Sequence, residues 1–100
     1  MNGLISSGGG KAYGVEVTTN LTEIIQASPS YKYIRITNLG STEVFIGPAN
    51  SGLAKDTGIA LSPKGTAASF VEFNNTGMFY CDFHAVTASG TAKLAILLGY

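Results

Sequence analysis

Short runs of alternating apolar and polar residues, separated every few residues by Gly, Ser, Asn or Pro, are what most constrains the fold of this chain. No segment of twelve or more residues shows the apolar spacing of a helix. Alternation with a period of two, bounded by turn-forming residues, is typical of an all-β sandwich or barrel. We therefore predict an all-β fold, a compact eight-stranded, two-sheet sandwich that is jelly-roll-like. The predicted strands are residues 14–19, 22–27, 31–38, 43–47, 58–62, 67–73, 78–84 and 91–99.

The clearest pattern is YKYIRITNLGSTEVFIG, residues 31–47, which predicts a strand, a polar turn and a returning strand. Alternation places Ile34 and Ile36 on one face of the first strand. Val44 and Ile46 match that face in the second, so we expect all four side chains to share one core. We interpret residues 67–73 and 78–84, around the turn NNTG, as a second hairpin.

A single domain is expected from 100 residues, divided into a flexible N-terminal arm, 1–13, and a β-sandwich domain, 14–100. The arm contains SSGGG, which is too flexible to pack alone. Leu4 and Ile5 precede this hinge, and the arm is either a loose tail or a segment that docks on a neighbouring subunit. The N-terminus does not have the pattern of a signal peptide, and the longest apolar run is too short to span a bilayer.

Charged residues make up 12% of the chain, against about 25% in ordinary soluble domains. Six basic and six acidic residues give a net charge of zero, which favours association. Either the surface is neutral and rich in Ser, Thr, Asn and Gly, or part of the exterior is buried against other chains; we favour the second. No basic stripe indicates nucleic-acid binding.

The sequence does not indicate catalysis, a metal or a cofactor. His84 is the sole histidine, whereas metal sites in small β-barrels need several ligands. Asp82 and His84 lie two apart on a predicted strand, but no motif supplies a nucleophile beside them. Cys81 is expected to be a small buried hydrophobe. We expect a protein that is not an enzyme.

Candidate interface residues come from tyrosines and from the last strand. Tyr31 and Tyr33 are expected on the face opposite Ile34 and Ile36, where tyrosine can anchor a contact. The last strand is apolar on both faces, so it is either central in its sheet or part of a contact with another chain. The candidates are Leu4, Ile5, Tyr13, Tyr31, Tyr33 and Leu97.

The segments RITNLGSTEVFIG, GIALSPKG, FNNTGMFYCDF and SGTAKLAILLGY give the chain a resemblance to small β-sandwich virion proteins of tailed bacteriophages. The resemblance covers roughly residues 16–99 and rests on turns and core positions. It implies a head decoration (cement) protein, made in the host cytoplasm and placed on the capsid exterior. It implies binding to the major capsid protein and self-association, with a trimer favoured over a dimer. A head- or tail-fibre module and a lectin-like, carbohydrate-binding sandwich are the alternatives.

Overall fold

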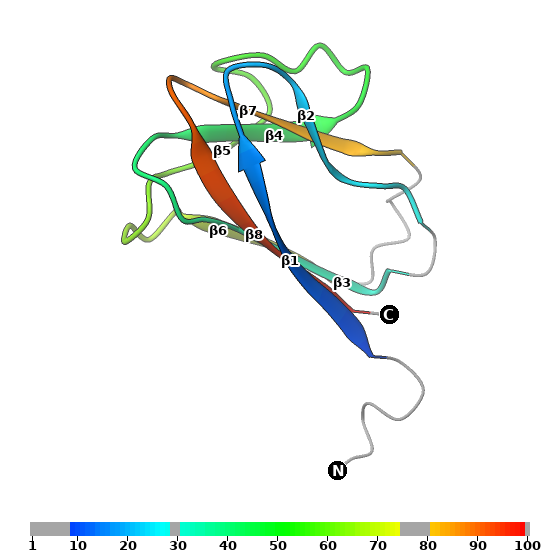
Figure 1. Ribbon diagram of the computed structural model, residues 1–100. Helices are drawn as coiled ribbons and strands as arrows, with labels where there is room; N and C mark the ends of the chain where they lie inside the picture. Colours follow the sequence, from blue (N-terminus) through cyan, green and yellow to red (C-terminus); the bar gives the residue numbers. More distant parts are fainter. Residues whose placement is uncertain (1–8, 29–30, 75–80, 100) are drawn as a thin grey trace.

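The computed structural model describes residues 9–28, 31–74 and 81–99. Within them the chain forms eight strands and no helix, as predicted (Figure 1). The strands are β1 (Gly10–Val17), β2 (Thr22–Ile25), β3 (Tyr33–Asn38), β4 (Val44–Pro48), β5 (Ile59–Leu61), β6 (Phe70–Asn74), β7 (Phe83–Thr87) and β8 (Ala92–Gly99).

The described strands form two antiparallel sheets of four, packed face to face (Figure 1). Sheet A has the order β1-β8-β3-β6, and sheet B has the order β2-β7-β4-β5. The chain changes sheet at every connection between these strands except β4–β5. Eight strands that alternate in this way between two antiparallel sheets are the arrangement of a jelly roll. The predicted two-sheet sandwich is therefore confirmed.

The described strands form neither predicted hairpin. β3 lies in sheet A and β4 in sheet B, so the turn between them crosses the sandwich instead of joining neighbouring strands. The same holds for β6 and β7. The predicted strand 78–84 overlaps β7 only at Phe83 and His84, and its residues 78–80 lie outside the described residues. Apolar alternation assigns a face to each strand, but it does not choose the neighbouring strand.

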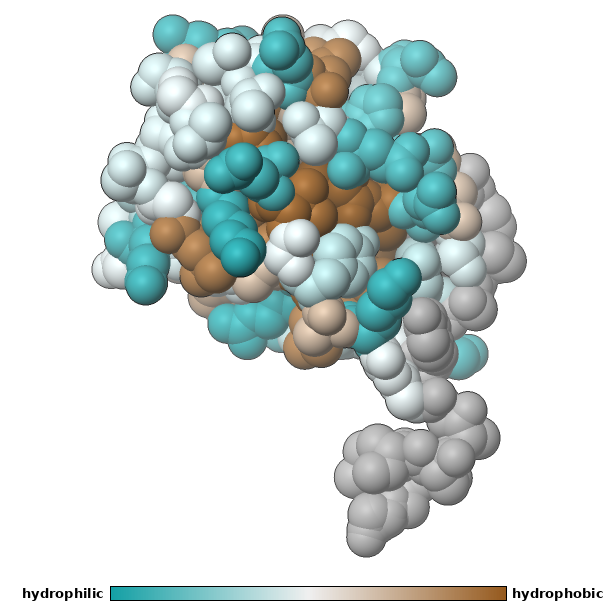
Figure 2. All heavy atoms as spheres, in the orientation of Figure 1, coloured by the Kyte–Doolittle hydropathy of each residue, from teal (hydrophilic) through white to brown (hydrophobic). Residues whose placement is uncertain are grey.

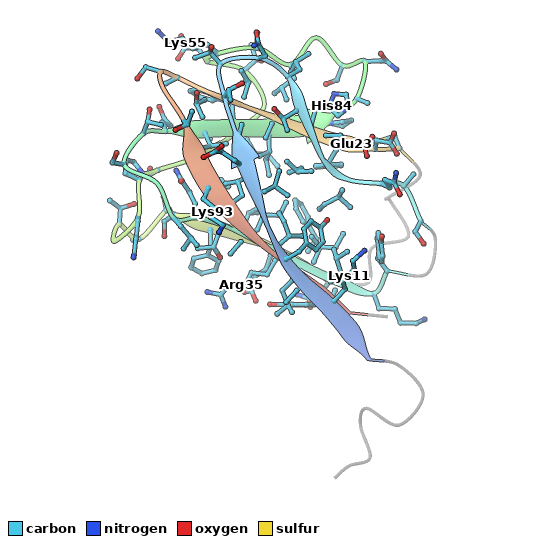
Figure 3. All side chains as sticks on the ribbon, in the orientation of Figure 1. Lys11, Glu23, Arg35, Lys55, His84 and Lys93 are labelled. Carbon is cyan, nitrogen blue, oxygen red and sulfur yellow. The ribbon has the colours of Figure 1, made fainter. Side chains whose placement is uncertain are left out.

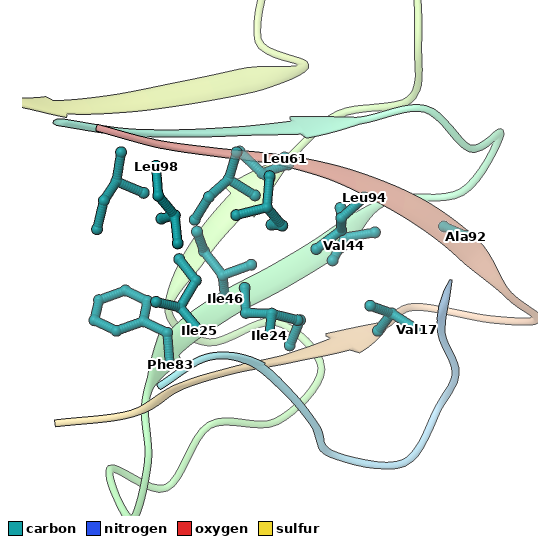
Figure 4. Close-up of a cluster of buried hydrophobic side chains, with 14 residues drawn as sticks. Val17, Ile24, Ile25, Val44, Ile46, Leu61, Phe83, Ala92, Leu94 and Leu98 are labelled. Atoms are coloured by element: carbon teal, nitrogen blue, oxygen red, sulfur yellow. The ribbon is translucent and has the colours of Figure 1, made fainter. Parts of the chain in front are cut away.

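The shared core of the first two segments is confirmed. Ile34, Ile36, Val44 and Ile46 are fully buried and belong to one cluster. They meet across the sandwich, two from each sheet, instead of side by side in one sheet. Figure 4 shows Val44 and Ile46 facing the side chains of sheet A from below. The packing is that of two inner faces interdigitating.

Asn38 holds the crossing between β3 and β4. It is fully buried, and its Nδ2 donates to the carbonyl of Thr42 at 2.8 Å and to those of Leu61 and Ser62 at 3.1 Å. Its Oδ1 accepts a 2.8 Å hydrogen bond from the Gly40 amide. One side chain thus satisfies backbone groups of the turn and of the segment that begins in β5, which a buried amide must do to be tolerated.

β1 begins at Gly10, so residues 10–13 belong to sheet A and not to an arm. β1 pairs along its whole length with β8, from Gly10 opposite Gly99 to Val17 opposite Ala92. β8 itself lies between β1 and β3, which is the first of the two alternatives that its two apolar faces left open. Leu4 and Ile5 lie outside the described residues.

Candidate functional site

The two outer faces of the sandwich differ. On sheet B, Phe45 and Val86 point outward, yet both are buried, because Leu53 packs on them as a second small core. Leu53 comes from the loop after β4, which lies over sheet B (green, Figure 1). The protein therefore covers the apolar centre of the outer face of sheet B, Phe45 and Val86, with its own chain, while Ala60 of β5 on the same face is exposed.

Gly58 lets this loop return close to the sheet. Its φ is +78°, a conformation that glycine adopts without strain. A β-carbon there would lie 2.5 Å from the carbonyl oxygen of Ile46 and 2.6 Å from Cδ1 of Leu53. Only a glycine fits at position 58, and the close return of the loop there keeps Leu53 against sheet B.

The outer face of sheet A is not covered in this way by any described residue. Leu97 of β8 is 43% exposed and Phe70 of β6 is 40% exposed. Between β1 and β8 the floor is made of small side chains, so the face is hollowed into a shallow groove of about 650 Å³. We name this surface the A-face; its residues are Ala12, Gly14, Tyr33, Arg35, Thr37, Leu39, Phe70, Glu72, Lys93, Ala95 and Leu97.

Polar side chains on one side of the A-face form a cross-strand cluster. The Arg35 guanidinium lies over the Phe70 ring, with Cζ 4.2 Å from its centroid, and Nη1 is 4.0 Å from Glu72 Oε2. The Tyr33 hydroxyl donates to the same carboxylate oxygen. This hydrogen bond, followed by desolvation and the Glu72 charge, raises the pKa of Tyr33 above its ordinary value. The cluster orders the rim of the A-face.

Lys93 borders the groove on its other side. A β-carbon at Gly14 would lie 2.5 Å from Lys93 Cε, so the aliphatic part of Lys93 crosses β1 at a position where there is no side chain. Figure 3 shows Lys93 and Arg35 on sheet A, away from His84 and Glu23 on sheet B. The A-face therefore has an apolar floor with a cation on each flank, as interface cores with polar rims do.

The structure places the predicted interface residues in two groups. Tyr33 and Leu97 lie on the A-face, as their alternation indicated. Tyr31 was expected beside Tyr33, but it packs partly buried against the core, so that expected position was wrong. Tyr13 is also half-buried, and its hydroxyl donates to the Ile24 carbonyl at 2.6 Å, tying β1 to β2.

Tyr13 and Tyr31 line a smaller groove of about 240 Å³ where the two sheets separate. Figure 2 shows apolar surface on this side of the molecule, framed by hydrophilic side chains, whereas the walls of the groove itself are mostly polar. Their contacts give both tyrosines a structural role at the edge of the core.

The Asp82–His84 pair does not form on a strand. Asp82 precedes β7, and its Oδ1 accepts a 2.8 Å hydrogen bond from the Ala27 amide. Cys81 is half-buried against the core. Among the described residues no three His, Cys, Asp or Glu side chains are grouped so that they could hold a metal ion.

Sequence reasoning missed two contacts, the stacking of Arg35 on Phe70 and the packing of Leu53 on Val86. Each contact joins residues that are far apart in the chain, so no local pattern reports it.

Comparisons with protein-family models, with curated proteins and with solved structures found no match to this chain. In the part of the chain that the structure describes, no helix has the length and apolarity needed to cross a membrane.

Proposed function

We propose that this chain is a structural virion protein of a tailed bacteriophage, which decorates the capsid exterior and stabilises it by bridging neighbouring capsomers. The observation that carries the proposal is the difference between the two outer faces. The chain buries Phe45 and Val86 of sheet B under Leu53, yet leaves Leu97 and Phe70 of the A-face exposed. Exposed apolar patches mark interaction sites, so we take the A-face as the surface that contacts a partner.

The composition of the A-face supports a protein partner. Exposed Leu97 and Phe70 and the small residues of the floor supply apolar area, while Arg35 and Lys93 lie on the flanks. Aromatic residues and arginine are enriched in interface cores and energetic hot spots. The resemblance of residues 16–99 to small virion proteins gives the class of that partner, the major capsid protein. Many copies with modest individual contacts would then act together through multivalency.

The direct test is the number of copies per particle. Virions of the phage or prophage that encodes this chain are purified, and the chain is quantified against the major capsid protein by gel densitometry. A decoration protein is expected at copy numbers comparable to those of capsid subunits. A fibre module is expected in far fewer copies, and absence from the particle would reject both.

A variant of the A-face locates the contact. Leu97→Glu places a charge on the exposed floor, opposite Arg35, and is expected to reduce binding to particles lacking the protein by at least about 10-fold. Leu21→Glu is the matched control, because Leu21 is 55% exposed in the turn between β1 and β2, away from the A-face. Equal binding by both variants would exclude the A-face as the attachment surface.

A lectin-like function is the second candidate. Tyr33, Phe70 and Glu72 place two aromatic rings and a carboxylate on one face, a combination that suits sugar binding. The Arg35 guanidinium already lies over the Phe70 ring, which makes this candidate weaker. A glycan array probed with the purified protein separates the two, since the decoration proposal expects no bound glycan.

A further inference from the structure

The four edge strands of the described sandwich are unequally protected against pairing with another chain. Exposed edges are templates for added strands, and proteins blunt them by shortness, bulges or charge. β5 has three residues. β2 has four, with a register shift between Glu23 and Ile25. β6 has five, with Glu72 at its middle. β1 has eight residues in unbroken register, and its N-terminal half projects past the body of the sandwich (Figure 1).

The hydrogen-bond pattern shows which backbone groups of β1 face outward. The Leu39 amide donates to the Lys93 carbonyl at 2.9 Å, so Lys93 directs its backbone groups toward β3. In an antiparallel sheet this direction alternates, so Ala92, Leu94, Ile96 and Leu98 direct theirs toward β1. Their register partners are Val17, Val15, Tyr13 and Lys11. The alternate residues, Gly10, Ala12, Gly14 and Glu16, therefore present their N–H and C=O groups to the free edge.

Those four residues offer little resistance to an incoming strand. Two are glycines and one is alanine, so three of the four have no side chain beyond a methyl group. On β6 the Asn38 amide donates to the Ser69 carbonyl, so by the same alternation the outward groups belong to Phe70, Glu72 and Asn74. The larger side chains of β6 border its free edge, whereas β1 leaves its edge accessible.

We propose that β1 pairs antiparallel with β1 of a second copy of this chain, so that the two copies of sheet A form one continuous eight-stranded sheet across a twofold axis. Gly10, Ala12, Gly14 and Glu16 of each copy supply the new hydrogen bonds. A twofold contact is self-complementary, because the same surface serves both copies.

The positions of the charges favour the antiparallel direction. β1 carries one cation, Lys11, near its start and one anion, Glu16, near its end (Lys11 is labelled in Figure 3). In the antiparallel pairing that uses all four outward residues, Gly10 of one copy lies opposite Glu16 of the other and Lys11 lies opposite Val15, so no like charges are opposed. An in-register parallel pairing would instead place Lys11 beside Lys11 and Glu16 beside Glu16, which is destabilising. The zero net charge of the chain does not oppose self-association. Pairing through β1 produces a dimer, whereas the resemblance implies a trimer. It concerns the free protein and does not depend on capsid binding.

The first test removes one outward N–H. Ala12→Pro deletes a donor that β8 does not use, and proline is tolerated on edge strands where the N–H faces solvent. The full chain is expected to sediment with twice the monomer mass at high concentration. Ala12→Pro is expected to sediment as a monomer with the same far-ultraviolet circular dichroism. Ala12→Ser, which keeps the N–H, is the matched control and is expected to remain a dimer.

The second test uses the unmodified protein and stays informative if Ala12→Pro fails to fold. Amide hydrogen exchange is measured by NMR from low micromolar to millimolar concentration. Exchange at Ala12 and Gly14 is expected to slow by at least about 10-fold as the dimer forms. The Lys11 and Val15 amides, already bonded to β8, are expected to change less. A protein that stays monomeric, a trimer, or a dimer in which Ala12 and Gly14 exchange at an unchanged rate would overturn the proposal.

Discussion

Asn38 is predicted to be the polar residue whose loss destabilises the sandwich most. Its two Nδ2 hydrogens serve three carbonyl groups and its Oδ1 accepts the Gly40 amide, so three hydrogens take part in bonds. At a net value of about 1 kcal/mol for each, Asn38→Ala costs about 3 kcal/mol. The unpaired groups and the space left behind raise the expected cost to about 3–5 kcal/mol. Domains of this size have about 5–15 kcal/mol in total.

Urea unfolding followed by circular dichroism measures this change. With a slope of about 1–3 kcal/mol per molar urea, the midpoint of Asn38→Ala is expected to fall by at least about 1 M. Thr42→Ala is the control in the same turn. Asn38 binds the Thr42 carbonyl, which the substitution keeps, so the expected loss is under about 0.5 kcal/mol. Equal losses in the two variants, or a loss below about 1 kcal/mol in Asn38→Ala, would refute the reasoning.

Asn38→Asp tests the same environment through the direction in which stability changes with pH. The new carboxylate would be buried against carbonyl oxygens, which disfavour its charge and raise its folded-state pKa above its unfolded value of about 3.9. Relative to the unmodified protein, the variant should therefore gain stability as pH falls through the folded pKa, and the gain is complete below the unfolded pKa. A stability difference independent of pH would contradict this environment.

Three further predictions concern the core, the cap and the A-face. Ile36→Ala, at a fully buried position, is expected to cost about 2–5 kcal/mol in urea unfolding. Leu53→Ala should cost about 2 kcal/mol and increase the fluorescence of a dye that binds apolar surface, because Leu53 covers sheet B. Glu72→Gln should lower the pKa of Tyr33 toward its ordinary 10.0, measured by phenolate absorbance. In the unmodified protein the Tyr33–Glu72 contribution to stability is full below pH 10.0 and declines as pH rises through the raised pKa of Tyr33.

The sequence predicted which face of a strand is buried more accurately than it predicted which strands pair. Alternation placed Ile34, Ile36, Val44 and Ile46 correctly in one core, because the period of two decides which side of a strand is buried. It did not reveal that the turn after Asn38 crosses to the other sheet, since a short polar turn suits both connections.

The candidate surface was predicted in part for the same reason. Leu97 was found because β8 is apolar on both faces. The Arg35–Phe70 stack requires β3 to pair with β6, where Tyr33 lies opposite Asn74, and no local pattern reports a pairing at that separation. β7 was expected too early, because the aromatic residues before Phe83 have a higher strand propensity than the Ala85–Val86 pair that the strand contains.

The central position of β8 has a consequence for the kinetics of folding. β8 is the last of the eight strands in chain order, yet it lies between β1 and β3. One of its two neighbours is therefore the strand at the opposite end of the chain. β3 and β6, or β4 and β5, are able to pair earlier, but sheet A stays divided until β8 inserts between β1 and β3. Closing such long loops before any contact forms makes folding slow, on the order of milliseconds to seconds. Until that step β1 has no neighbour on either side, so the interval before β8 inserts is when the chain is most exposed to aggregation.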